Sequence, residues 1–266
     1  MPLLPKAARA ALHFWEEPCI SGTRGSGTVF FSGCSLSCVY CQNYGISHKN
    51  FGKIITAERL AEIFKELENS GAHNINLVNP THYTFALKQA LDIYKPNIPV
   101  VYNSGGYDTT EQLELLKDYI DIYLMDLKYL DSERAYKYSG AADYPEVAEK
   151  AIKYCCSLVP DCTFKNGIMQ KGVIIRHLIL PQGTNEAIRV FNWARENVPN
   201  AFFSMMAQYV PCGRAEEFPP LDRRITKREY EKVIGYICES GAENVYIQEL
   251  ESGSKQYIPP FDLEGI

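Results

Sequence analysis

Residues 33–43 read Gly33-Cys34-Ser35-Leu36-Ser37-Cys38-Val39-Tyr40-Cys41-Gln42-Asn43, which places three cysteines at the spacing C-x3-C-x2-C. The apolar run Thr28-Val29-Phe30-Phe31 precedes them and is expected to form a buried strand. Three thiolates on one loop can converge on a single metal centre. A closed structural zinc site needs four ligands, and a four-iron cluster is usually held by four cysteines. Three cysteines therefore leave one iron open for catalysis. Free thiols on a turn, or part of a zinc site, are the alternatives.

Length and composition describe an ordinary enzyme-sized chain. It has 266 residues, of which 46% are hydrophobic and 22% charged, so it can bury a sizeable core as one large domain or one α/β barrel. The net charge of −5 gives no reason to expect nucleic-acid binding. No apolar run approaches the length of a membrane span. Nine cysteines, three of them clustered, favour a metal site in the reducing cytoplasm over a disulfide framework.

Strand and helix patterns alternate along most of the chain. Strands are expected at 28–31, 74–78, 98–102, 121–127, 173–180, 202–207 and 244–248, and helices at 56–70, 80–94, 108–117, 143–158, 184–198 and from 226. The first segment, 1–26, lacks strong periodicity and is interpreted as a lead-in, with a short helix at 7–15. Such alternation builds a parallel sheet, either doubly wound or closed toward a barrel. A site at the end of the first strand favours the barrel. We predict a single domain over 1–266, with a core at 27–210 and a C-terminal helix, strand and tail at 211–266.

Polar side chains recur where the expected strands end. Unpaired polar groups are costly in a core, so their recurrence indicates a site for a polar, charged small molecule. Taken singly, each has a plainer interpretation: Asp126 and Lys128 as a local ion pair, and Arg176 as the partner of a helix carboxylate. The set comprises Asn79, Thr81, His82, Asn103, Ser104, Asp126, Lys128, Arg176, His177 and Gln208.

The cysteine spacing resembles the signature of the radical S-adenosylmethionine (SAM) enzymes. In that family the loop holds a [4Fe–4S] cluster, whose open iron takes the amino and carboxylate groups of SAM. Reduction then splits SAM to a 5′-deoxyadenosyl radical that abstracts a hydrogen atom. The resemblance implies cluster ligation by Cys34, Cys38 and Cys41, matches Tyr40 to the aromatic residue before the last cysteine, and implies a partial (β/α)6 barrel.

Within that superfamily the chain resembles the activating enzymes of glycyl radical enzymes, with pyruvate formate-lyase activating enzyme as prototype. The matching features are the cysteine loop followed by Gln42-Asn43, Asp126-Leu127-Lys128, and Arg176 with Pro181. The resemblance implies that Asp126, Lys128 and Arg176 meet SAM. The whole set of expected SAM contacts is Tyr40, Asn79, Thr81, Asn103, Ser104, Asp126, Lys128, Arg176 and Gln208.

Two departures mark a divergent homologue. Asn79-Pro80-Thr81-His82 stands where the family usually has Gly-Gly-Glu-Pro, and Gln208 stands where the prototype has His. The expected partners are a glycyl radical enzyme or a peptide substrate, and an electron donor such as flavodoxin or ferredoxin. Two alternatives stay open: a radical SAM enzyme that acts on a peptide or small molecule, and a non-catalytic metal-binding or redox protein. The polar strand ends argue against the latter, because electron transfer needs no such pocket.

Overall fold

The computed structural model describes residues 4–250 and 259–266. A ten-stranded sheet runs through them in the order β10-β9-β8-β6-β5-β4-β2-β1-β3, with β7 paired to β8 beside this path. The strands are β1 (Lys6–His13), β2 (Ser26–Phe31), β3 (Lys53–Ile54), β4 (Ile75–Val78), β5 (Val100–Ser104), β6 (Ile122–Asp126), β7 (Thr163–Lys165), β8 (Ile168–Leu178), β9 (Phe202–Met206) and β10 (Val245–Ile247). From β2 to β10 the pairs along the path are parallel, whereas β1 and β3 pair antiparallel.

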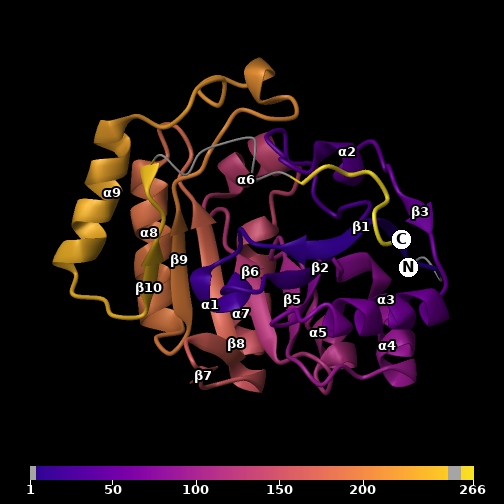
Figure 1. Ribbon diagram of the computed structural model, residues 1–266. Coiled ribbons are helices and arrows are strands. Elements are labelled where there is room, and N and C mark those ends of the chain that lie inside the picture. The colour runs from indigo at the N-terminus through magenta and orange to yellow at the C-terminus, as the bar shows by residue number, and fades with distance from the viewer. Residues whose placement is uncertain (1–3, 251–258) are drawn as a thin grey trace.

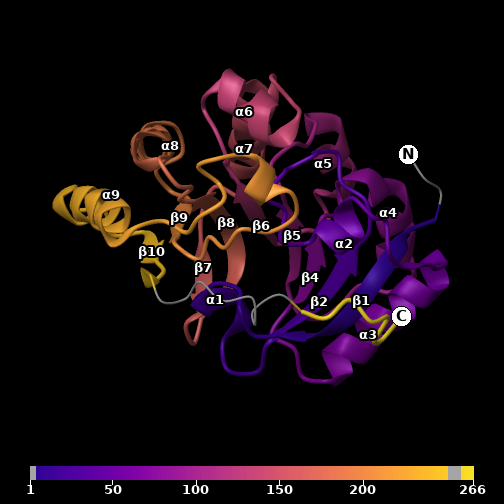
Figure 2. The same ribbon diagram turned by 90° about the horizontal axis from the view of Figure 1, so that it is seen from above.

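The main helices cover the convex side of this sheet (Figure 2). The α-helices are α1 (Pro18–Ser21), α2 (Tyr44–Ser47), α3 (Ala57–Asn69), α4 (Thr84–Ile93), α5 (Thr110–Leu116), α6 (Ser132–Ser139), α7 (Tyr144–Leu158), α8 (Thr184–Asn197) and α9 (Lys227–Glu239). Because the strand order is linear and the sheet curved, the barrel stays open (Figures 1 and 2). The predicted α/β class and partial barrel are confirmed.

Local signals account for several helices. Thr56 caps α3 by accepting a hydrogen bond from the Arg59 amide, and Thr226 and Glu229 form a capping box where the last helix, α9, is expected to begin. The apolar face of α3, which includes Leu60 and Phe64, is buried. These features form as expected because each depends on residues within one or two helical turns.

The first segment differs from its interpretation as a lead-in with a helix at 7–15. Residues 6–13 form β1, which pairs antiparallel with β2 along its length. The chain then turns into α1, whose Cys19 and Ile20 pack against Val101, Leu124 and Ile174 from the concave face of the sheet. Alternate residues of the same strands pack with the helices instead, as the two-residue period of a strand requires. The segment after β1 therefore fills the barrel interior.

Other elements also differ from the sequence expectation, among them α2 and β3, which are not expected from the sequence. Neither α6 nor the short strand β7 is among the expected elements. The helix expected from residue 108 begins at Thr110, with a capping box that joins Thr109 to Gln112. Asp108 is buried just before this helix, and its carboxylate accepts hydrogen bonds from the hydroxyl groups of Thr81, Tyr102 and Ser104. These hydroxyl donors satisfy the buried carboxylate, as a buried polar group requires.

The C-terminal region adds to the same structure. Strand β10 pairs parallel with β9. Residues 259–266 run beside β1, where the Ala10 amide donates to the Glu264 carbonyl at 2.8 Å. The middle of the predicted tail, 251–258, lies outside the described residues. Among the residues described, no helix is long and apolar enough to span a membrane.

Candidate functional site

A cavity of about 250 Å³ lies at the carboxyl ends of the parallel strands. This is the edge where parallel α/β folds place their sites, because the strand-to-helix loops converge there. The cavity brings together most of the predicted site residues, which come from the cysteine loop and from the ends of β5, β6, β8 and β9. Those in its wall are Tyr40, Cys38, Cys41, Asn103, Asp126, Lys128, Arg176 and Gln208.

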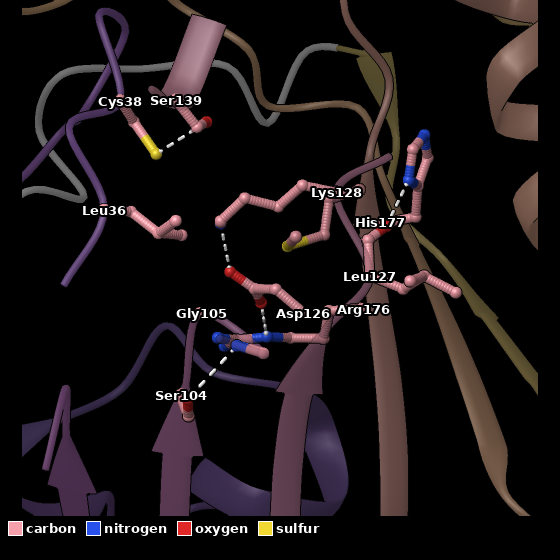
Figure 3. Close-up of polar contacts among 12 residues, drawn as sticks. Leu36, Cys38, Ser104, Gly105, Asp126, Leu127, Lys128, Ser139, Arg176 and His177 are labelled. Carbon is pink, nitrogen blue, oxygen red and sulfur yellow. Dashed lines mark hydrogen bonds and ion pairs between the residues drawn. The ribbon is translucent and has the colours of Figure 1, made fainter. Parts of the chain in front are cut away.

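Four side chains of alternating charge cross the floor of the cavity. Arg176 donates from Nε to Asp126 Oδ1 at 2.9 Å, and Lys128 Nζ lies 2.5 Å from Asp126 Oδ2. On its other side, the Arg176 guanidinium donates to Glu16 Oε2 at 3.1 Å. Figure 3 shows Asp126 between Arg176 and Lys128, with Lys128 extending toward the loop that holds Cys38. The order Glu16, Arg176, Asp126, Lys128 compensates each buried charge with its neighbour.

These contacts hold the ionised forms in a largely buried site. Burial by itself raises the pKa of the Asp126 carboxyl, but Arg176 and Lys128 outweigh it and hold this pKa below its usual value. Burial lowers the pKa of Lys128, yet the Asp126 charge prevails and the net pKa is raised. Both groups are therefore charged at neutral pH. Arg176 also donates to Asn103 Oδ1 at 2.7 Å, so three of its five N–H groups have protein acceptors.

The cysteine loop is packed against the end of α6. Its amides at Ser37 and Val39 donate to the carbonyls of Ser139 and Tyr138, at 3.0 and 2.9 Å. Cys38 is buried, and Cys34 is exposed. Burial raises the pKa of the Cys41 thiol to about 12, and the neighbouring Cys38 adds to the shift. The loop is thus held in place against α6 by backbone contacts.

Each sulfur atom of the loop also has a hydrogen-bond partner. Cys34 Sγ accepts from the Leu36 amide at 3.4 Å. Cys38 Sγ lies 3.0 Å from Ser139 Oγ, and Cys41 Sγ lies 3.2 Å from Ser47 Oγ. Donors of this kind stabilise negative charge on sulfur, which is the state in which a cysteine binds metal.

Four residues of the predicted set do not line the cavity, and three of them are bound by the surrounding scaffold. Thr81 Oγ1 donates to Asp108 Oδ1 at 2.7 Å, and Ser104 Oγ donates to the other oxygen of the same carboxylate. Asn79 donates from its side chain to the Gly33 carbonyl at the start of the cysteine loop. Their polar groups are satisfied by the scaffold, so these residues support the loops around the site. Cys34, the fourth, stays at the exposed edge of the loop.

Sequence reasoning missed Glu16 and Ser139. Glu16 lines the cavity and accepts from the side-chain amides of Asn76 and Asn103 at 3.1 Å each, besides Arg176. It lies in a segment without periodicity, where a single carboxylate gives no signal. Ser139 ends a helix that was not predicted.

Gly106 lies beside the charged floor in a conformation that requires glycine. A Cβ at this position would collide with the Asp126 carbonyl oxygen, and φ is +84° there.

The three cysteines do not form a site for a single ion. Among the described residues, no three His, Cys, Asp or Glu side chains are grouped so that they could hold one metal ion. A [4Fe–4S] cluster binds its cysteines to different irons, so its thiolates are spaced more widely than the ligands of one ion. The donor set, three sulfurs on one loop with hydrogen bonds, fits the cluster and not a closed zinc site.

Comparisons with known proteins agree with this geometry. The family model described as the radical SAM superfamily matches residues 28–180. A curated protein of Methanocaldococcus jannaschii, "Uncharacterized protein MJ0674", is 34% identical over 233 residues, which cover 84% of this chain and 64% of that protein. The chain thus spans less than two thirds of that relative.

Solved structures share the fold. Streptococcus suis SuiB bound to S-adenosylmethionine has a TM-score of 0.58 at 19% identity, covering 82% of this chain and 48% of that one. Methylornithine synthase (PylB) has a TM-score of 0.56 at 13% identity, covering 91% of this chain and 71% of that one. The family match extends over more than half of the chain, including the cysteine loop and the strands whose ends carry Asp126 and Arg176. The chain belongs to the radical SAM superfamily.

Proposed function

We propose that this radical SAM enzyme takes a hydrogen atom from a partner protein, as the activating enzymes of glycyl radical enzymes do. The observation that carries the proposal is the shared cavity of the cysteine loop and the charged floor formed by Arg176, Asp126 and Lys128. The activating-enzyme assignment is favoured by the sequence features around these residues. Trp15 lines the cavity and is 55% exposed, so the wall of the cavity extends to the protein surface.

Radical SAM enzymes use a [4Fe–4S] cluster and SAM, and the residues of this site fit both. Cys34, Cys38 and Cys41 are proposed to hold the cluster. Bound together, the two cofactors supply a one-electron cleavage of the SAM sulfonium that permits hydrogen-atom abstraction. The protein supplies binding, orientation and a site shielded from water.

The charged floor is proposed to bind the amino-acid part of SAM. Lys128 donates to Asp126 within the described part of the chain, and its ammonium carries further N–H groups for a carboxylate. Arg176 can add its two remaining N–H groups. Asp126, Asn103 and Gln208 offer oxygens for the SAM ammonium and ribose. Tyr40 contributes an aromatic wall next to the cysteine loop. A small electron-transfer protein such as flavodoxin or ferredoxin is the proposed reductant.

Anaerobic reconstitution tests this proposal. The full chain is loaded with iron and sulfide, reduced with dithionite and given SAM, and 5′-deoxyadenosine is measured. Wild type is expected to form it and Cys38→Ala to lose it, because that sulfur is buried in the loop. A Cys155→Ala variant is the matched control, since Cys155 is buried in the core away from the cavity. If Cys38→Ala keeps both its iron and its 5′-deoxyadenosine formation, the proposal is contradicted.

A second measurement addresses the substrate. The loaded enzyme is mixed with a candidate glycyl radical enzyme, and the glycyl radical is sought by electron paramagnetic resonance. Production of 5′-deoxyadenosine with a peptide or small molecule, but with no radical on any such partner, would favour the alternative substrate class.

A further inference from the structure

The C-terminal end of α6 places one hydroxyl group on a cysteine of the loop. Gly140 ends the helix in the left-handed region, with φ of +75°, and the loop amides at Ser37 and Val39 bind the last carbonyls. This docking fixes the backbone of Ser139 beside Cys38. Its Oγ lies 3.0 Å from Cys38 Sγ, the contact drawn in Figure 3.

Two tyrosine hydroxyl groups extend this hydrogen bond into a series that leads away from the sulfur atom. Tyr129 Oη lies 3.0 Å from Ser139 Oγ, and Tyr40 Oη lies 2.6 Å from Tyr129 Oη. All four side chains are buried, with Tyr129 and Ser139 each 1% exposed. Water therefore does not compete for these hydrogen bonds, and the local dielectric strengthens them.

We propose that Tyr40, Tyr129 and Ser139 form a directional hydrogen-bond relay that raises the reduction potential of the cluster bound through Cys38. The inference rests on the proposed role of Cys38 as a cluster ligand. A metal-bound thiolate carries no proton and can only accept, so the Ser139 hydroxyl must donate to it. Ser139 Oγ then accepts from Tyr129, and Tyr129 accepts from Tyr40. A single bound sulfur thus sets the direction of all three protons.

The other two sulfurs have simpler surroundings. Cys41 Sγ contacts Ser47 Oγ, which also contacts His48 Nδ1 in an exposed position. Cys34 Sγ has a backbone amide at the longer distance of 3.4 Å. In the described part of the chain, Cys38 is therefore the loop cysteine whose hydroxyl partner is buried and is itself hydrogen-bonded to further buried hydroxyl groups.

The sign of the effect follows from charge. One-electron reduction adds negative charge to the cluster and its thiolates, and a hydrogen bond to sulfur stabilises the reduced form more than the oxidised one. Each hydroxyl in the relay polarises the next, so the tyrosines act on the cluster through Ser139. Ser139, Tyr129 and Tyr40 are positioning residues in this scheme, and the effect decreases with distance from the sulfur.

The test is a mediator titration of the reconstituted full chain, followed by the paramagnetic signal of the reduced cluster. At a fixed solution potential, Ser139→Ala is expected to lower the ratio of reduced to oxidised cluster by roughly three- to tenfold. Tyr129→Phe should lower it less, and Tyr40→Phe least. Tyr209→Phe is the matched control: its ring packs 6.1 Å from the Tyr40 ring, but its hydroxyl donates to the Leu221 carbonyl. Ser139→Thr keeps a hydroxyl and should restore the parent potential.

Different results overturn different ideas. A Cys38→Ala variant that keeps its cluster would contradict the proposed function itself. If Cys38 is required but Ser139→Ala leaves the potential unchanged, the relay alone is wrong. If Ser139→Ala shifts the reduction potential but neither tyrosine variant does, only the Ser139 hydrogen bond acts on the cluster, and the relay is wrong. Should Ser139→Ala fail to load a cluster, the tyrosine variants, which lose one oxygen each, still decide the question.

Discussion

The Asp126→Asn substitution examines the charged floor most directly. The change keeps the shape of the side chain, and Asn can still accept from Arg176 Nε at Oδ1. It replaces Oδ2, 2.5 Å from Lys128 Nζ, with an amide group that carries only donors. Arg176 retains Glu16 as a counter-charge, so the loss falls mainly on Lys128.

The magnitude follows from burial. Breaking a buried ion pair by removing one partner costs about 3–5 kcal/mol, because the other charge stays buried and unpaired. The Lys128 side chain is 20% exposed and faces the cavity, so part of this penalty is relieved by water. We therefore expect the free energy of unfolding to fall by about 2–4 kcal/mol.

A double-mutant cycle isolates the cause. Urea unfolding at equal iron content is followed by circular dichroism for Asp126→Asn, Lys128→Met and the combined variant. Removing the Lys128 charge should make the combined loss about 1–2 kcal/mol smaller than the sum of the single losses. A loss below about 1 kcal/mol in Asp126→Asn, or strict additivity, would refute the argument that Asp126 compensates a buried cation.

Three further predictions concern other charges of the chain. Glu16→Gln should cost about 1–2 kcal/mol in urea unfolding and lower 5′-deoxyadenosine formation, because Arg176 loses a buried counter-charge but keeps Asp126; unchanged values for both would oppose this role. Asp108→Asn should cost about 1–3 kcal/mol, since the new amide group faces hydroxyls that had donated to a carboxylate; a scan of melting temperature checks it. Glu229, whose pKa Arg223 lowers to about 2 against its burial, contributes stability that is present above about pH 4.5 and lost as pH falls toward 2; Glu229→Gln should flatten acid unfolding over that range.

The sequence alone determined the features that depend on neighbouring residues. The three-cysteine loop follows a buried strand, helices and strands alternate, and caps such as Thr56 and Thr226 begin their helices where expected. Polar residues at successive strand ends could be placed together because parallel strands end at one edge of a sheet. This is why Asp126, Lys128 and Arg176 were found without a structure.

The partners of these side chains depend on how distant segments of the chain pack together. Glu16 and Arg176 are 160 residues apart in sequence, and no local pattern links them. Thr81 and Ser104 stand at strand ends like Asn103, yet their side chains donate to the buried Asp108. Ser139 reaches Cys38 across 101 residues. Local propensity acts over a helical turn, whereas a buried charge or hydroxyl is placed by whatever segment the folded chain packs against it.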